Sequence, residues 1–390
     1  MRETWKQKND ELARVFKTGL DTSRIQRVVL PGAMGGSAIG VSVVKMLLAN
    51  LGFQVELEIM PHYPDPTRPL RPDDFAALYS YSGNTEELLL WIDMIESAGA
   101  QATGFATGGR LKEICVEKGF PFVQIPGKSF NLAQPREHLP VSICLLLGML
   151  GNTGLAWKDE NGSRLTFNLD EWFPRLLATS NKLTELAEST YNIDIPCTGN
   201  VAKKAALFLN WGTNNPAKID SFSALRDPVF WASSFYEAIA RRMENQFGEC
   251  VERPASAKIM PEDLHNEQEA YVEQWLERVW GTGEEQVTTP QPSKVVFLRY
   301  RGPLDGRLDI RAGKVFDEFL AGAPRMTFTL QDYGRDYPML GELEALLFSD
   351  LTRAFASVFR GVTPHYVHSM TYNKHFMASV PGGPGSTGQY

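Results

Sequence analysis

Three hydroxyl side chains lie within one short segment, "SYSGNTEE" at residues 80–87. Ser80, Ser82 and Thr85 could donate hydrogen bonds without adding a fixed charge. Asn84 is followed three residues later by a glutamate, which is the spacing of a capping box, so we expect a helix to begin there. The N-terminus of that helix would add backbone N–H groups and a positive dipole end. This combination suits a phosphate dianion, although the same residue types are also common in turns that bind nothing.

A second glycine-rich cluster, "GAMGGSAIG", occupies residues 32–40 between an expected strand and an expected helix. It matches neither the GxGxxG fingerprint nor the GxxxxGK[ST] loop, so the cluster does not indicate dinucleotide or triphosphate binding. Gly35 and Gly36 would allow close approach to a backbone, and Ser37 would stand at the start of the next helix. A tight turn packed against the first strand explains the cluster equally well.

Two titratable residues in the second half of the chain could transfer protons. Glu249 ends an apolar-patterned helix beside Cys250, where a partly buried carboxylate could act as a general base. His265 lies in the acidic segment "MPEDLHNEQE", at residues 260–269, which is also typical of a solvated helix start. The sequence contains no HxxxH or HExxH metal motif and no GxSxG elbow, so we expect neither a metal site nor a serine hydrolase.

Composition restricts the class of protein. The chain has 390 residues, a formal net charge of −7 and a pI near 5.5, which argues against nucleic acid or an anionic membrane as the main partner. Four scattered cysteines form no CxxC pair and indicate reduced thiols in a cytoplasmic protein. The most apolar run, residues 139–151, is shorter than the roughly 20 residues that cross a bilayer, so we expect a buried helix there.

Strand and helix patterns alternate in the first third of the chain, which predicts βαβ units and a parallel sheet between helical layers. The carboxyl ends of such strands are where ligands bind, so the turns described above would lie at the binding edge. The expected strands are residues 26–30, 54–60, 75–82, 101–107 and 120–126, and the expected helices are residues 37–52, 84–100, 109–119 and 139–151.

A polar, Gly/Asn-rich stretch at residues 151–170 predicts a boundary between two domains. We expect an N-terminal domain at 1–155, a connecting helix at 156–190, a C-terminal domain at 191–377 and a disordered tail at 378–390. In the second half the expected helices are residues 230–248, 262–280 and 341–361, and the expected strands are residues 214–222 and 294–300.

Taken together, these motifs resemble the sugar isomerase (SIS) superfamily, and most closely its bifunctional phosphoglucose/phosphomannose isomerases. "SYSGNTEE" matches the family signature letter for letter, and "GAMGGSAIG" is similar to its GMGGSxIG turn. More diffuse similarity covers "QFGECVERPASAKIMPEDLHNE" at 246–267 and "GVTPHYVHSMTYNK" at 361–374. The resemblance spans roughly residues 25–376. It implies two SIS-type three-layer α/β/α domains with parallel, flavodoxin-like sheets.

The resemblance also implies roles for individual residues. Glu249 would shuttle a proton between C1 and C2 of the sugar, and Arg136 would stabilise the enediolate. His265 would open the sugar ring with assistance from Lys374. The residues implied to hold the 6-phosphate are Gly36, Ser37, Ser80, Ser82 and Thr85.

The implied protein is a cytoplasmic homodimer of glycolysis or gluconeogenesis that needs no cofactor and no metal and has a sugar phosphate as its substrate. Its active site would be shared between the subunits, because the ring-opening histidine of relatives comes from the neighbouring subunit. This sequence departs from the family at Gly248-Glu249-Cys250, where relatives have Asn-Glu-Asn. That departure keeps a second hypothesis open: a SIS protein that binds a phosphosugar for regulation and does not turn it over.

Overall fold

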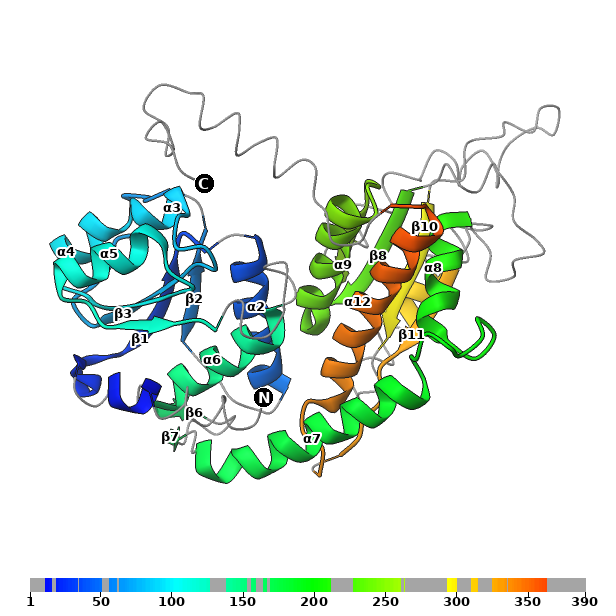
Figure 1. Ribbon diagram of the computed structural model, residues 1–390, viewed down its shortest axis with the longest axis horizontal. Coiled ribbons are helices and arrows are strands. Elements are labelled where there is room, and N and C mark those ends of the chain that lie inside the picture. Colours follow the sequence, from blue (N-terminus) through cyan, green and yellow to red (C-terminus); the bar gives the residue numbers. More distant parts are fainter. Residues whose placement is uncertain are drawn as a thin grey trace, which may run out of the picture. The chain divides into compact units, whose positions relative to one another are not determined.

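The computed structural model describes residues 11–15, 19–33, 35–50, 56–61, 63–126, 138–152, 156–158, 164–166, 169–211, 227–260, 263, 293–299, 310–314, 325–334 and 336–362. These residues divide after Pro174 into two compact units. Each unit contains a sheet of parallel strands with helices packed on it, shown in Figure 1. The predicted fold class, two α/β domains with parallel sheets, is therefore confirmed. Among the described helices, none is long and apolar enough to cross a membrane.

The first unit is built on a five-stranded sheet in the order β2-β1-β3-β4-β5, and every pair in it is parallel. Its strands are β1 (Arg27–Pro31), β2 (Leu57–Met60), β3 (Asp74–Tyr79), β4 (Gln101–Ala106) and β5 (Phe122–Gln124), preceded by the 3₁₀ turn η1 (Thr22–Arg24). From β1 the chain first moves outward to β2 and then returns to the other side as β3. The topological switch point, where ligands bind in sheets of this order, lies between β1 and β3.

Helices cover both faces of this sheet, with α2 and α6 on one side and α3, α4 and α5 on the other (Figure 1). The helices are α2 (Gly35–Asn50), α3 (Glu86–Leu89), α4 (Ile92–Ala98), α5 (Gly109–Lys118) and α6 (Leu139–Asn152). The single helix predicted at 84–100 is interrupted, because the Trp91 N–H bonds to the Leu88 carbonyl three residues back in a 3₁₀ turn. Its buried face is kept, since Leu88, Trp91 and Ile95 remain in the core at helical spacing.

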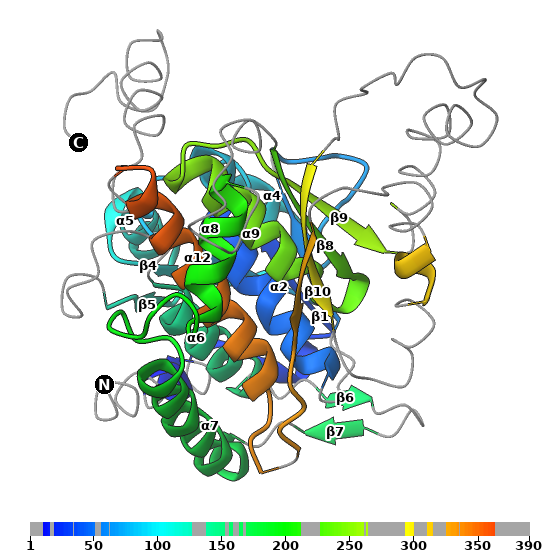
Figure 2. The same ribbon diagram turned by 90° about the vertical axis from the view of Figure 1, so that its right-hand side faces the viewer.

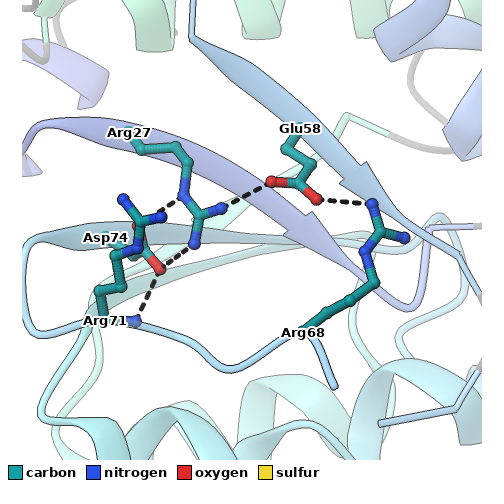
Figure 3. Close-up of polar contacts among 5 residues, drawn as sticks. All are labelled: Arg27, Glu58, Arg68, Arg71 and Asp74. Atoms are coloured by element: carbon teal, nitrogen blue, oxygen red, sulfur yellow. Dashed lines mark hydrogen bonds and ion pairs between the residues drawn. The ribbon is translucent and has the colours of Figure 1, made fainter. Parts of the chain in front are cut away.

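A charged network closes the amino-terminal edge of this sheet (Figure 3). Arg27 at the start of β1 donates two hydrogen bonds, of 2.8 and 2.6 Å, to the fully buried carboxylate of Asp74 at the start of β3. Arg27 also contacts Glu58 of β2 at 2.6 Å, and Glu58 in turn pairs with the half-exposed Arg68 at 2.6 Å. The Arg71 N–H donates to Asp74 at 2.8 Å. One guanidinium thus joins the starts of three strands, and hydrogen bonding to Asp74 raises the pKa of Arg27.

We expect Arg27→Met to lower the free energy of unfolding of the first unit by about 3 kcal/mol, because it leaves the buried Asp74 carboxylate without its cation. Arg68→Met is the matched control: it removes a guanidinium from the same network at its exposed end and should cost less than about 1 kcal/mol. Urea denaturation of both variants measures the difference. Equal losses would show that the buried pair has no special weight.

The second unit contains a four-stranded parallel sheet in the order β11-β10-β8-β9. Its strands are β8 (Asp227–Ser233), β9 (Ser256–Met260), β10 (Ser293–Arg299) and β11 (Arg325–Thr329). One face is covered by α8 (Val201–Trp211), α9 (Glu237–Cys250) and α12 (Leu340–Phe359), as Figure 2 shows, and the 3₁₀ turn η6 (Ser234–Tyr236) joins β8 to α9. From β8 the chain goes first to β9 on one side and then to β10 on the other, just as it goes from β1 to β2 and then to β3. The two sheets therefore share the same strand topology.

Two of the elements predicted for the second half are confirmed, and a third, the helix predicted at 230–248, is confirmed from residue 237 onward but wrong at its start. β10 and α12 confirm the strand predicted at 294–300 and the helix predicted at 341–361. Residues 230–233 belong to β8, however, and not to the helix predicted at 230–248. Six of the seven β8 residues are buried, and a short run of buried apolar residues has no alternation to distinguish a central strand from a helix.

Other parts of the chain connect these elements or lie outside the described residues. A small antiparallel hairpin, β6 (Ala156–Lys158) and β7 (Arg164–Thr166), precedes α7 (Leu169–Ser189), and α7 contains the division point between the units. The strand predicted at 214–222 and the tail predicted at 378–390 lie outside the described residues, and so does the helix predicted at 262–280 except for Asp263.

Buried cations organise the second unit. Lys294 of β10, which is fully buried, donates to the carbonyls of Leu209 and Asn210 at the end of α8, both at 2.9 Å. Arg253 donates to the same two carbonyls at 3.2 Å, and burial lowers its pKa. Cations are favoured at the C-terminus of a helix, where the last carbonyl groups have no partner within the helix. This arrangement joins α8 to the sheet.

Candidate functional site

The two sequence motifs meet at the switch point of the first unit. β1 and β3 are paired neighbours, so the segments that leave their carboxyl ends start side by side. Gly32, directly after β1, has a φ of +62°, and a Cβ there would overlap the backbone of Leu88 in α3. A glycine is therefore required for this close approach. The sequence pattern attributes such an approach to Gly35, but the space beside Gly35 is open and its φ of +52° explains the glycine instead.

The hydroxyl groups of the turn after β3, at residues 80–85, which we call the second turn, lie in two kinds of environment. Ser80 is 2% exposed, and its Oγ lies 2.8 Å from Thr85 Oγ1 and accepts a 3.1 Å hydrogen bond from the Gly83 N–H. Ser82 is exposed, and its Oγ accepts from the Asn84 N–H at 3.2 Å. Ser80 thus braces the turn from inside, while Ser82 faces outward.

Free backbone donors lie in the same turn. Within the described residues, the N–H groups of Ser82, Thr85 and Glu86 have no hydrogen-bond acceptor. They lie between the end of β3 and the first turn of α3, where strand ends and helix starts form anion sites. The turn therefore offers neutral hydroxyl and amide donors to an anion at the carboxyl edge of the sheet.

One aromatic residue beside this turn gave no sequence signal. Tyr63 lies in the segment that follows β2, and its side chain is exposed. The nearby carboxylates of Glu86 and Glu87 raise the pKa of its phenol. The loop after β2 therefore lies close enough to the start of α3 for their charges to interact. No motif includes Tyr63, and only the fold brings it to this edge.

The turn is attached to α5, and here the predicted capping box is wrong. Thr85 is the N-cap residue of α3, and no side chain caps that helix. Asn84 instead accepts from the Arg110 N–H at 2.9 Å, and the Gly83 carbonyl accepts from the Leu111 N–H at 2.9 Å. Both donors belong to the first turn of α5 and have no partner within their helix, so Asn84 caps a different helix from the expected one.

We expect Gly83→Ala to cost roughly 2 kcal/mol more than Gly99→Ala in the free energy of unfolding, because a Cβ at residue 83 would overlap the Gly108 carbonyl oxygen. Both glycines have φ near +70°, but residue 99 has open space, so Gly99→Ala should cost only about 1 kcal/mol for the left-handed backbone. Thermal and urea unfolding measure the two losses. A Gly83 variant as stable as the Gly99 variant would contradict the close packing of the turn.

The remaining predicted phosphate residues, Gly36 and Ser37, lie in the first turn of α2, and the structure describes their backbone only. Three predicted catalytic residues, Arg136, His265 and Lys374, lie outside the described residues. The fold thus brings together the turns carrying Ser80 and the glycine cluster, both in the first unit.

Glu249 belongs to the second unit. It is the penultimate residue of α9 and is partly buried. Because α9 leaves the carboxyl end of β8 and returns to the start of β9, Glu249 lies toward the amino-terminal edge of its own sheet. α9 is fixed to α12 by Arg242, whose guanidinium donates to Asp350 at 2.9 and 3.0 Å, and by Gln246, which donates to Asp350 at 2.8 Å.

The helix that carries Glu249 ends in an unusual conformation. Glu252 has a φ of +51°, and the Arg253 N–H bonds back to the Phe247 carbonyl at 3.2 Å, which is a helix end that normally uses glycine. In the described parts of the chain, no group of three His, Cys, Asp or Glu side chains could hold a metal ion.

Comparisons with known proteins agree with the motifs. Residues 214–377 match the family described as "Bacterial phospho-glucose isomerase C-terminal SIS domain". A bifunctional phosphoglucose/phosphomannose isomerase of Caldicellulosiruptor bescii is 28% identical over 265 residues, 67% of this chain and 67% of the relative. A D-glucosamine-6-phosphate 4-epimerase of Sulfolobus acidocaldarius is 26% identical over 276 residues, 70% of this chain and 72% of the relative.

A solved structure shares the fold. It is that of a candidate phosphosugar isomerase from Clostridium difficile 630, with a TM-score of 0.62, 13% identity and coverage of 96% of this chain and 94% of that chain. The family match and the curated relatives confirm the resemblance to bifunctional phosphoglucose/phosphomannose isomerases that the sequence motifs indicate, and the solved structure confirms the fold.

Proposed function

We propose that this chain, whose residues 214–377 match the family described as bacterial phospho-glucose isomerase C-terminal SIS domain, is an aldose–ketose isomerase of hexose 6-phosphates. It would interconvert glucose 6-phosphate, mannose 6-phosphate or both with fructose 6-phosphate. The observation that carries the proposal is the meeting of two hydroxyl- and glycine-rich turns at the β1/β3 switch point. Ser80 and Asn84 have roles in packing the turn, but the exposed Ser82 hydroxyl and the backbone N–H groups of the turn are donors of the kind that a phosphate needs.

The phosphate anchor would combine several neutral donors. In the second turn these are the hydroxyl groups of Ser82 and Thr85 and free N–H groups, with Ser80 holding Thr85 at 2.8 Å from inside. Gly36 and Ser37 would complete the anchor from the first turn. Neutral donors hold the phosphate without a fixed counterion, so binding would depend on the geometry of the turns.

The chemistry would be proton transfer through a cis-enediolate. Glu249 would remove the proton from one of C1 and C2 and return it to the other. Arg136 would stabilise the oxygen that becomes negatively charged, and His265 with Lys374 would open the sugar ring. A carboxylate base and a cation suffice for this reaction, so the proposal includes neither a metal nor a cofactor.

The family resemblance also supports an assembly. We propose a homodimer in the cytoplasm in which the ring-opening His265 comes from the neighbouring subunit. The altered surroundings of the base, Gly248 and Cys250, would leave the Glu249 carboxylate without the two flanking amides that relatives have.

We expect purified protein to convert fructose 6-phosphate into glucose 6-phosphate, mannose 6-phosphate or both, followed separately by NMR in the presence of EDTA. Glu249→Gln should lower the turnover about 10²- to 10⁴-fold, because it removes the base and keeps the shape. Glu244→Gln is the matched control: it is the same change on the same helix, at a residue that pairs with Arg241 at 3.3 Å, and it should leave turnover unchanged.

Other outcomes of this assay would contradict the proposal in distinct ways. Loss of activity on chelation would contradict the metal-free mechanism. Equal losses in both glutamine variants would remove Glu249 from the role of base. Thermal stabilisation by fructose 6-phosphate without any product would indicate the regulatory phosphosugar-binding protein instead.

The relative from Sulfolobus acidocaldarius gives a second candidate, epimerisation at C4 of glucosamine 6-phosphate, since it matches a comparable share of the chain. The same NMR assay started from glucosamine 6-phosphate distinguishes the two. Inversion at C4 with no product from fructose 6-phosphate would favour the epimerase.

A further inference from the structure

The start of α6 contacts both elements that carry the proposed phosphate turns. Gly40, the last glycine of the first motif, lies in α2, and a Cβ there would come within 3.3 Å of the Ser142 Cβ and 3.8 Å of Leu146 Cδ1, both in α6. A larger residue would therefore push the two helices apart. This glycine serves the packing of α2 on α6, although it stands in a motif that suggests ligand binding.

The contact between α6 and the second turn depends on the alternating directions of successive side chains at the end of β3. Tyr79, the last residue of β3, is buried and donates to Ser142 Oγ at 2.6 Å, and Ser142 donates to the His138 carbonyl at 3.1 Å. Burial raises the pKa of the Tyr79 phenol, so it remains a donor. Ser80 points to the other side, toward Thr85.

Tyr81 returns to the α6 side. Its ring lies against the ring of His138, with centroids 4.5 Å apart and planes tilted by 51°, and His138 is only 1% exposed. The Tyr81 carbonyl accepts from both the N–H and the hydroxyl of Thr107, at 3.0 and 2.9 Å. Tyr81 is therefore held by its ring on one side and by its carbonyl on the other. It stands directly between Ser80 and Ser82.

We propose that His138 is a positioning residue for the phosphate turn: its ring fixes Tyr81, between the Ser80 brace and Ser82, and thereby sets where the donors of Ser82 and Thr85 lie. This inference rests on the proposed phosphate site, and it adds a residue that no motif in the sequence indicated. His138 does not touch the substrate in this proposal. It acts through an aromatic contact, so the shape of its ring matters more than its nitrogen atoms.

The test measures binding by calorimetry in the full chain, with fructose 6-phosphate and inorganic phosphate as the two probes. We expect His138→Ala to weaken both by about ten- to a hundredfold, because small displacements of positioned groups have effects of this size. His138→Phe keeps a ring of similar width and should restore most of the affinity. In the isomerase assay, His138→Ala should raise KM much more than it lowers kcat.

Ile95→Ala controls for general loss of stability, because it opens a cavity at a fully buried residue of α4, in the core on the face of the sheet opposite α6. If Ile95→Ala weakens binding as much as His138→Ala, or if His138→Phe gives no rescue, the positioning role is wrong. A wild-type chain that binds fructose 6-phosphate without converting it contradicts the isomerase, and the same binding constants still decide the role of His138. A wild-type chain that binds neither probe contradicts both proposals.

Discussion

The parallel pairing of β1 with β3 is the constraint on which the candidate site depends. Because the chain leaves β1 for β2 and returns as β3, the segments after β1 and β3 diverge to opposite faces of the sheet. Their first residues nevertheless start together, and Gly32 brings one of them against the backbone of α3. Two turns that are separate in the sequence therefore begin side by side at one edge of the sheet.

The two edges of the first sheet use their polar groups differently. At the amino-terminal edge, Arg27 and Asp74 satisfy each other in a buried ion pair, and little of that charge is available to a ligand. At the carboxyl edge the turn at residues 80–85 presents hydroxyls and backbone N–H groups, beside the Glu86 and Glu87 carboxylates of the α3 start, and several of these N–H groups have no acceptor among the described residues. The two edges therefore differ in whether their hydrogen-bonding groups already have partners within the chain.

The turn itself is held by contacts along its whole length, because each part of it also supports a neighbouring element. Ser80 contacts Thr85. Gly83 and Asn84 accept hydrogen bonds from the free N–H groups in the first turn of α5, and Tyr81 is held between Thr107 and His138. A site made of neutral donors gains affinity from preorganisation, since no strong charge compensates for a misplaced group. The supports around the turn are therefore as important as the residues that would face the phosphate.

The α/β class, the two motif turns and the family resemblance could be predicted from the amino-acid sequence, because these depend on local periodicity and on contiguous residues. The sequence did not identify β8, since a buried central strand lacks alternation. The packing of the folded chain was needed to show that Ser80 is a buried brace and that Gly32 makes the close approach. It also showed that Asn84 caps α5 by accepting from the Arg110 N–H, 26 residues away in the chain. The physical reason is the same in each case: a side chain or N–H group takes the partner that the packed sheet brings within reach, and sequence spacing cannot measure that distance.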